Sequence, residues 1–239
     1  QGCKCPMRDF FEMGRSPVSG PDVAVASSHP IASAVALEVL AQGGNAVDAA
    51  VAATFVLCVV EPQSTGLGGD CFAQVFKAGA SRPIALNGSG RSPRGLNPVA
   101  ALRDGGAPLG ETSVHAVTVP GLVDGLATLL ADHGTLSLAQ VLAPAIRYAE
   151  LGFAVLQRVA EEWAFVAEKL ARTPSARAAL LPGGRAPAAG DRFASPALAR
   201  TLQAIARDGT DAFYRGAVAA AAVKFLTACG GTHALADFA

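Results

Sequence analysis

The chain has 239 residues, of which 51% are hydrophobic and 16% are charged, and its 19 Lys and Arg are balanced by 19 Asp and Glu. This composition excludes an intrinsically disordered chain, and the length is sufficient for one large domain with a substantial core. Proteins that bind nucleic acid or anionic membranes usually carry a basic patch or stripe. The zero net charge and the lack of any charge run therefore argue against both partners.

The N-terminal segment, residues 1–22, is predicted to be a stub ahead of a single domain, residues 23–239. Residues 1–6 precede a natural start at Met7, and we set them aside as upstream or vector-derived sequence. The longest apolar run, 49–60, is too short to span a bilayer. We therefore expect a soluble protein of the cytoplasm, or of the periplasm or exterior if a signal peptide has been removed.

Helix and strand signals fill the rest of the chain. A Ser-Ser-His-Pro run at 27–30 begins a helix that ends at Gly43, and Asn45 caps a second helix, 46–60, that is apolar on nearly every side. The predicted strands, with both faces of the first two covered, are 72–77, 84–87 and 114–119. The later predicted helices are 122–132, 138–150, 155–172, 196–207 and 211–228, with a surface loop at 181–190.

Two glycine-rich loops are candidate sites. EPQSTGLGGD, 61–70, lies between a helix and a strand, an order that fits neither a Walker loop nor a dinucleotide loop. A nucleotide-binding module built on 66–69 is thus a disfavoured alternative to a tight turn. NGSGRSP, 87–93, follows the second strand, and its Arg91 offers a planar fork of donors suited to a carboxylate, although a solvated loop arginine fits the pattern equally well.

The other reactive residue types give weaker signals. The five cysteines have neither the count of a disulfide framework nor the spacing of a zinc site, and Cys58 is predicted to be a small buried hydrophobe. No pair of histidines has metal-ligand spacing. His29 is assigned to a helix start, His133 to a helix end and His115 to a strand, and none is expected to act as a base.

Seven ordered motifs resemble the γ-glutamyltranspeptidase family, and the resemblance runs from about Val23 to the end of the chain. Its most specific part is GGNAVDAA. The motifs are VASSHP at 25–30, QGGNAVDAA at 42–50, VEPQSTGLGG at 60–69, VTVPG at 117–121, PAIRYA at 144–149, DAFYRG at 211–216, and Gly230-Gly231 with Ala236-Asp237.

The resemblance implies an α/β fold, the four-layer αββα sandwich of N-terminal-nucleophile hydrolases, with this chain contributing the large-subunit part. Family members are made as a precursor, or zymogen, that cuts itself. The new N-terminal threonine of the small subunit then attacks an amide carbonyl, with its own amino group as base and backbone N–H groups holding the oxyanion. Neither a metal nor an organic cofactor is implied.

The same resemblance sets the expected partners. These are the small subunit from the same precursor and a small-molecule amide substrate, and the family admits a dimer of heterodimers. The chain is expected to stop short of the self-cleavage site, so no catalytic residue is assigned to it and it should be inert alone.

The substrate class is expected to be decided near Arg91. In γ-glutamyl enzymes an arginine four residues before a proline grips the α-carboxylate, but four residues before Pro93 stands Ser89. Arg91 comes two residues later, a shift of several ångströms along an extended chain. This version resembles relatives that act on other amides, among them oxamate amidohydrolase and acylases.

The leading hypothesis is therefore an amidohydrolase that cleaves a small carboxylate-bearing, oxamate-like amide. Its predicted substrate-binding residues are Arg91, Ser89 and Asn87. The alternative is a γ-glutamyltransferase or glutathione hydrolase in which Arg91 reaches the same carboxylate from another register.

Overall fold

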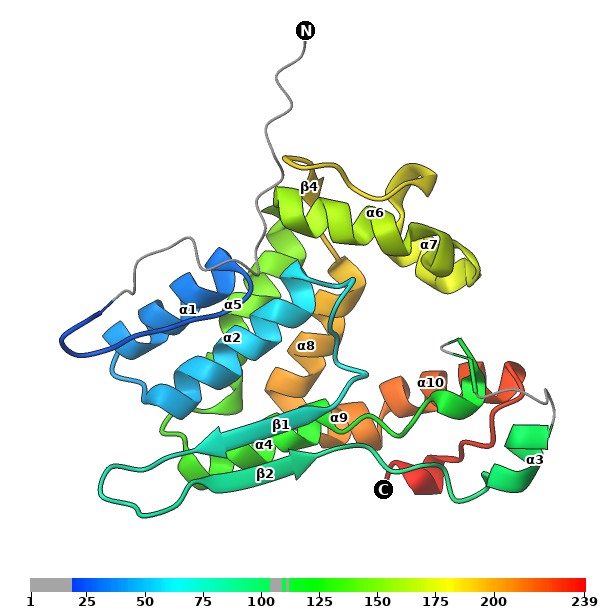
Figure 1. Ribbon diagram of the computed structural model, residues 1–239, viewed down its shortest axis with the longest axis horizontal. Coiled ribbons are helices and arrows are strands. Elements are labelled where there is room, and N and C mark those ends of the chain that lie inside the picture. Colours follow the sequence, from blue (N-terminus) through cyan, green and yellow to red (C-terminus); the bar gives the residue numbers. More distant parts are fainter. Residues whose placement is uncertain (1–18, 104–108, 111) are drawn as a thin grey trace, which may run out of the picture.

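The computed structural model describes residues 19–103, 109–110 and 112–239, so most of the predicted N-terminal stub lies outside the described residues. Helices α1, α2, α5 and α8 lie side by side, and the β1–β2 hairpin lies across one end of this layer (Figure 1). The elements are α1 Pro30–Ala41, α2 Ala46–Val60, β1 Cys71–Val75, β2 Ile84–Gly88, α3 Pro98–Arg103, η1 Val114–Ala116, α4 Leu122–His133, α5 Leu138–Leu151, β3 Phe153–Ala154, α6 Gln157–Ala171, α7 Pro174–Leu180, η2 Pro182–Gly184, β4 Arg192–Phe193, α8 Pro196–Asp208, α9 Asp211–Tyr214, α10 Ala217–Ala228 and η3 Leu235–Asp237.

Helix α2 is the centre of the core, as its apolar sequence predicts. Neighbouring helices α1, α4 and α5 pack around it, and Val51, Phe55 and Val60 are fully buried. The side chain of Asn45 accepts hydrogen bonds from the backbone N–H groups of the first turn, so the predicted cap is confirmed. Eleven of its 15 residues are buried, and a helix covered on most of its circumference is held by several neighbours at once.

The start of α1 depends on a neutral histidine. The Nδ1 atom of His29 accepts a hydrogen bond from the backbone N–H of Ile31 at 3.1 Å, which makes His29 the cap. Burial, followed by the positive charge of Arg158, lowers the pKa of His29 to about 4. The imidazole is therefore unprotonated near neutral pH and keeps the lone pair that the cap requires.

A buried carboxylate joins α2 to the connection between α4 and α5. Asp48 accepts four hydrogen bonds: from the Asn45 N–H at 2.8 Å, the Thr135 N–H at 2.9 Å, the Thr135 hydroxyl at 2.7 Å and the Leu136 N–H at 3.0 Å. Burial acts to raise the pKa of Asp48, but these hydrogen bonds outweigh it and leave the pKa below its ordinary value. Gly134 has no room for a Cβ, which would lie 2.7 Å from Asp48 Oδ1.

The hairpin β1–β2 confirms the first two predicted strands, with Cys71 opposite Gly88 and Val75 opposite Ile84. One face packs on α4, where a Cβ on Gly125 would lie 3.0 Å from the Cβ of Cys71. The expectation that both faces are covered is wrong for this chain: Phe72 is 69% exposed and Phe76 is 65% exposed. No other described segment lies over that face, because the chain supplies a helix to one side only.

The third predicted strand, 114–119, is also wrong. Its first residues form the 3₁₀ helix η1, which places His115 in a helical turn, and the rest is extended but joins no sheet among the described residues. The segment is held by single bonds, such as that from the Val119 N–H to the Arg91 carbonyl, rather than by a ladder. An apolar run of this length does not distinguish a strand from an unpaired extended segment.

The other differences lie at helix ends. The predicted helix 211–228 is two helices, α9 and α10, because Gly216 is extended and a Cβ there would lie 2.5 Å from the Ala212 carbonyl oxygen. Helices α3 and α7 were not predicted, and α6 begins two residues late because the short β3 pairs with β4. Cys58 is buried as predicted, and burial raises its pKa to about 12.

Replacing Asp48 with alanine should lower the free energy of unfolding of the complete protein by roughly 3–5 kcal/mol, since it leaves buried donors without an acceptor. Because the folded-state pKa of Asp48 is depressed, its contribution is fully present above about pH 4 and is lost as the pH falls further. Denaturant unfolding at pH 7 and pH 3 measures both effects. Asp132→Ala, at an exposed position on α4, is the matched control; equal losses for the two variants at pH 7 would contradict the assignment.

Candidate functional site

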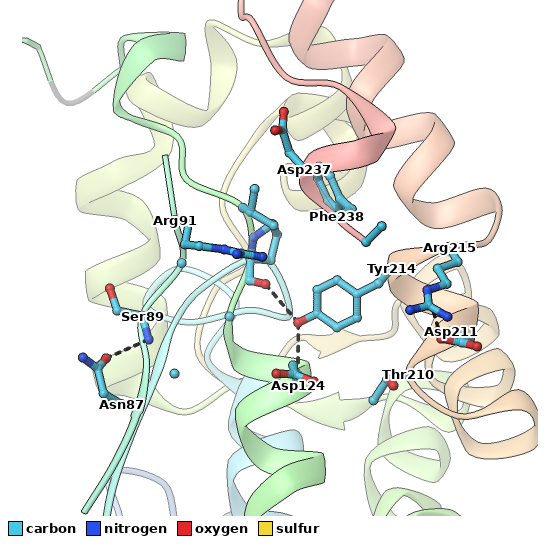
Figure 2. Close-up of a pocket in the computed structure, with 16 residues that line it drawn as sticks. Asn87, Ser89, Arg91, Asp124, Thr210, Asp211, Tyr214, Arg215, Asp237 and Phe238 are labelled. Atoms are coloured by element: carbon cyan, nitrogen blue, oxygen red, sulfur yellow. Dashed lines mark hydrogen bonds and ion pairs between the residues drawn. The ribbon is translucent and has the colours of Figure 1, made fainter. Parts of the chain in front are cut away.

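A pocket of about 300 Å³ lies where the end of β2, the segment before α4, helix α9 and the last residues of the chain meet. Figure 2 shows Arg91 on one side of the pocket and Tyr214 with Arg215 on the other. The three residues predicted to bind substrate, Asn87, Ser89 and Arg91, all line this pocket. The structure therefore brings the whole predicted set to one place.

The loop that presents Arg91 begins with an Asx turn. The side-chain oxygen of Asn87 accepts a hydrogen bond from the backbone N–H of Ser89 at 3.0 Å. Arg91 is exposed, and within the described ranges its guanidinium has neither an ion pair nor a hydrogen bond. By contrast, Arg215 on the far wall is paired with Asp211 at 3.6 Å. The positive charge and the N–H donors of Arg91 are thus available to a ligand.

Two backbone segments cross at the pocket with no room for side chains. A Cβ on Gly90 would lie 1.8 Å from the Val119 carbonyl oxygen, and a Cβ on Gly121 would lie 2.0 Å from the Gly88 carbonyl oxygen. Real Cβ atoms do not approach so closely. The Gly-Ser-Gly sequence ahead of Arg91 is therefore required by close approach of two backbones, not by a positive φ.

The opposite wall is fixed by Tyr214. Its hydroxyl donates to the Pro120 carbonyl at 2.9 Å and accepts from the Asp124 N–H at 3.0 Å (Figure 2). Burial raises the pKa of Tyr214 to about 12, so the hydroxyl keeps its proton and can make both bonds. Sequence reasoning did not single out Tyr214 or Asp124, although the DAFYRG motif contains the tyrosine.

The upper edge of the pocket, in Figure 2, is held by Asp237, which sequence reasoning also did not assign. Its carboxylate accepts backbone N–H groups from Ala234 at 2.8 Å and Arg94 at 3.1 Å. These bonds, the Ala234 one foremost, hold the pKa of Asp237 below its ordinary value. One side of the pocket therefore carries the Asp237 carboxylate, which already accepts backbone N–H groups. The other side carries the Arg91 guanidinium, which has no hydrogen bond or ion pair among the described residues.

The glycine loop at 66–69 is engaged by the fold. The Gly69 N–H donates to the Gly66 carbonyl, and the Gly69 carbonyl accepts the N–H groups of Gly121 and Leu122 at the start of α4. This geometry fits the tight-turn interpretation and gives no support to a nucleotide site.

Among the described residues, no group of three or more His, Cys, Asp or Glu side chains could hold a metal ion. No helix in this part of the chain is long and apolar enough to cross a membrane.

Comparison with known proteins identifies the family. The family model described as Gamma-glutamyltranspeptidase matches residues 32–239. The crystal structure of Helicobacter pylori γ-glutamyltranspeptidase superimposes with a TM-score of 0.87 at 35% identity, over 93% of this chain and 65% of that chain. This chain belongs to the γ-glutamyltranspeptidase family and has the α/β fold of the large-subunit part of these N-terminal-nucleophile hydrolases.

Two curated relatives are equally similar to the chain. It is 39% identical to the glutathione hydrolase proenzyme of Bacillus subtilis, over 89% of this chain and 37% of the relative. It is also 39% identical to the oxamate amidohydrolase proenzyme of Klebsiella pneumoniae, over 94% of this chain and 43% of the relative. The chain thus spans about two fifths of the length of either relative.

Gly90→Ala should displace the Arg91 loop and destabilise the complete protein by about 1–3 kcal/mol, because the added methyl group meets backbone that cannot move aside easily. Gly68→Ala is the control, since a Cβ at Gly68 meets nothing within 4 Å. That variant should be neutral or slightly stabilising. Thermal unfolding of the two variants checks the prediction, and equal melting temperatures would show that the crossing of the two backbones is not tight.

Proposed function

We propose that this chain is the large-subunit part of an autoprocessed amidohydrolase that cleaves a small amide bearing a carboxylate group. The observation that carries the proposal is the Arg91 guanidinium, which stands on the pocket wall without an ion pair among the described residues. A planar guanidinium forms two parallel hydrogen bonds with a carboxylate, and such bonds are stronger than neutral ones. Arg91 would orient the substrate by its acid group.

Asn87 and Ser89 supplement the arginine. Both residues line the pocket, and because the Asn87 side-chain oxygen is engaged with the Ser89 N–H, the donors that they would offer to a substrate are the Asn87 amide NH₂ and the Ser89 hydroxyl. These donors would support the carboxylate-binding role proposed for Arg91.

The reaction chemistry is assigned to the rest of the protein. In the proposed mechanism a threonine hydroxyl of the small subunit attacks the amide carbonyl, the C–N bond breaks, and water hydrolyses the resulting acyl ester. The N–H groups of Ser89, Gly90, Val119 and Gly121 all donate within this chain. These four donors are therefore not free to stabilise an oxyanion, and the role left to this wall is to bind and orient substrate.

We propose that the small subunit covers the open face of the hairpin β1–β2. The hairpin β1–β2 has no further strand on either edge among the described residues, and one of its faces exposes Phe72 and Phe76. Unpaired strand edges and apolar faces of this kind are normally covered. Since the relatives are more than twice as long as this chain, we assign the cover to a later segment of the same precursor.

A glutathione hydrolase is the second candidate, because the relatives of both activities are equally similar to this chain. What favours the acid amide is the register of the arginine. Ser89 stands where γ-glutamyl enzymes are expected to carry the arginine, and Arg91 follows two residues later, on the far side of the constrained Gly90.

In the complete protein, Arg91→Ala should raise KM for the acid amide by roughly 10- to 100-fold, the equivalent of losing a charge-assisted hydrogen bond of about 1.5–3 kcal/mol. Arg91→Lys should recover part of the loss, because it restores the charge but not the fork. Steady-state kinetics with oxamate and with a γ-glutamyl anilide measure the effect and the preference together. Arg82→Ala, in the exposed hairpin turn, is the control. Turnover of the anilide alone would defeat the acid-amide assignment in favour of a γ-glutamyl enzyme.

Intact-mass analysis of the purified complete protein should find two polypeptides, the second of which begins with threonine. Replacing that threonine with alanine should leave a single uncut precursor without activity, because one hydroxyl performs both the self-cleavage and the hydrolysis. A single uncut polypeptide with normal turnover would refute the proposed mechanism.

A further inference from the structure

We propose that Asp70 is a positioning residue that holds the Arg91 loop, residues 88–91, and so sets where the guanidinium stands in the pocket. The inference rests on the carboxylate-binding role proposed above for Arg91. Among the described residues, those that line the pocket do not include Asp70. It therefore acts on the substrate only through the loop.

Asp70 makes a side-chain hydrogen bond to the neighbouring strand just beyond the end of the β ladder. Cys71 and Gly88 are the last paired residues of the hairpin. Asp70 is the residue before Cys71, and its Oδ1 atom accepts a hydrogen bond at 2.8 Å from the backbone N–H of Gly90, two residues after Gly88. A side-chain oxygen of Asp70 thus accepts the hydrogen bond in place of the next backbone carbonyl of the ladder.

The backbone of Val119 contacts the loop from the other side. The Arg91 carbonyl accepts the Val119 N–H at 2.9 Å, and the Val119 carbonyl oxygen leaves no room for a Cβ on Gly90. Gly90 therefore lies between the Asp70 carboxylate and the Val119 backbone. Since Arg91 is the next residue, its Cα is fixed by the same two contacts.

The segment that carries Asp70 is itself hydrogen-bonded to the start of α4. The carbonyl of Gly69, the residue before Asp70, accepts the N–H groups of Gly121 and Leu122 at the first turn of that helix. In the part of the chain that the structure describes, no ion pair joins Asp70 to Arg91. The geometry thus uses the Asp70 carboxylate as a backbone acceptor and leaves the arginine charge for a ligand.

The test compares Asp70→Ala, Asp70→Asn and the control Asp132→Ala in the complete protein. Two readouts are needed: amide hydrogen exchange of the peptide that contains residues 86–92, and KM and kcat for oxamate or, if that is what the protein turns over, a γ-glutamyl anilide. Asp70→Ala should speed exchange about tenfold and raise KM about 5- to 10-fold, with kcat within about twofold of the parent. Asp70→Asn keeps the oxygen acceptor and should stay close to the parent, as should the control.

A double-mutant cycle separates this inference from the proposed function. In the Arg91→Ala background, adding Asp70→Ala should raise KM no further, because a residue that acts through Arg91 has nothing left to position. Unchanged exchange in Asp70→Ala, or an additive effect in the double variant, would overturn the positioning role. If Arg91→Ala itself leaves KM unchanged, the carboxylate-binding proposal fails, and so does the predicted effect of Asp70 on substrate binding. The hydrogen-exchange result still decides whether Asp70 holds the loop.

Discussion

The fold depends on one ionised carboxylate placed in the core. Asp48 is fully buried, yet its charge is balanced by four hydrogen-bond donors and by the start of α2, and it has no ion pair among the described residues. A buried charge is tolerated only when such donors are present and correctly placed. Asp48 thereby fixes the start of α2 to the turn between α4 and α5, and with it the relation between the central helix and the helix that supports the hairpin.

The geometry of the pocket follows from the position of α4 relative to α2. Helix α4 lies against the hairpin and begins at Gly121, where the backbone crosses the Gly88–Gly90 stretch. The loop after α2 reaches the same point through the Gly69 carbonyl. Three chain segments thus meet at the base of the Arg91 loop, and each is tied to the core by main-chain bonds. The backbone that carries Arg91 thus has little freedom to move, which is a condition for the selective binding of a small acid proposed for this residue.

Sequence reasoning succeeded where a local pattern has one physical solution. The capped, mostly apolar α2 and the hairpin strands are such cases, since the cap and the alternation of side chains fix both structure and direction. It failed for 114–119, where a backbone contact with the distant Arg91 overrides the local pattern. It also failed for the break at Gly216, which depends on the close approach of Gly216 to the Ala212 carbonyl one turn earlier. The same limit applies to the site: Arg91, Ser89 and Asn87 are close in sequence, whereas Tyr214 and Asp237 reach the pocket only through the tertiary fold.

The open face of the hairpin also bears on how such a protein can be made. Two exposed phenylalanines and strand edges that are unpaired among the described residues are an aggregation hazard unless another segment covers them. If the covering segment is encoded in the same polypeptide, its effective concentration is on the order of millimolar regardless of expression level. Cutting the chain only after folding would then guarantee equal numbers of the two pieces, an assurance that synthesis from separate messages would not give.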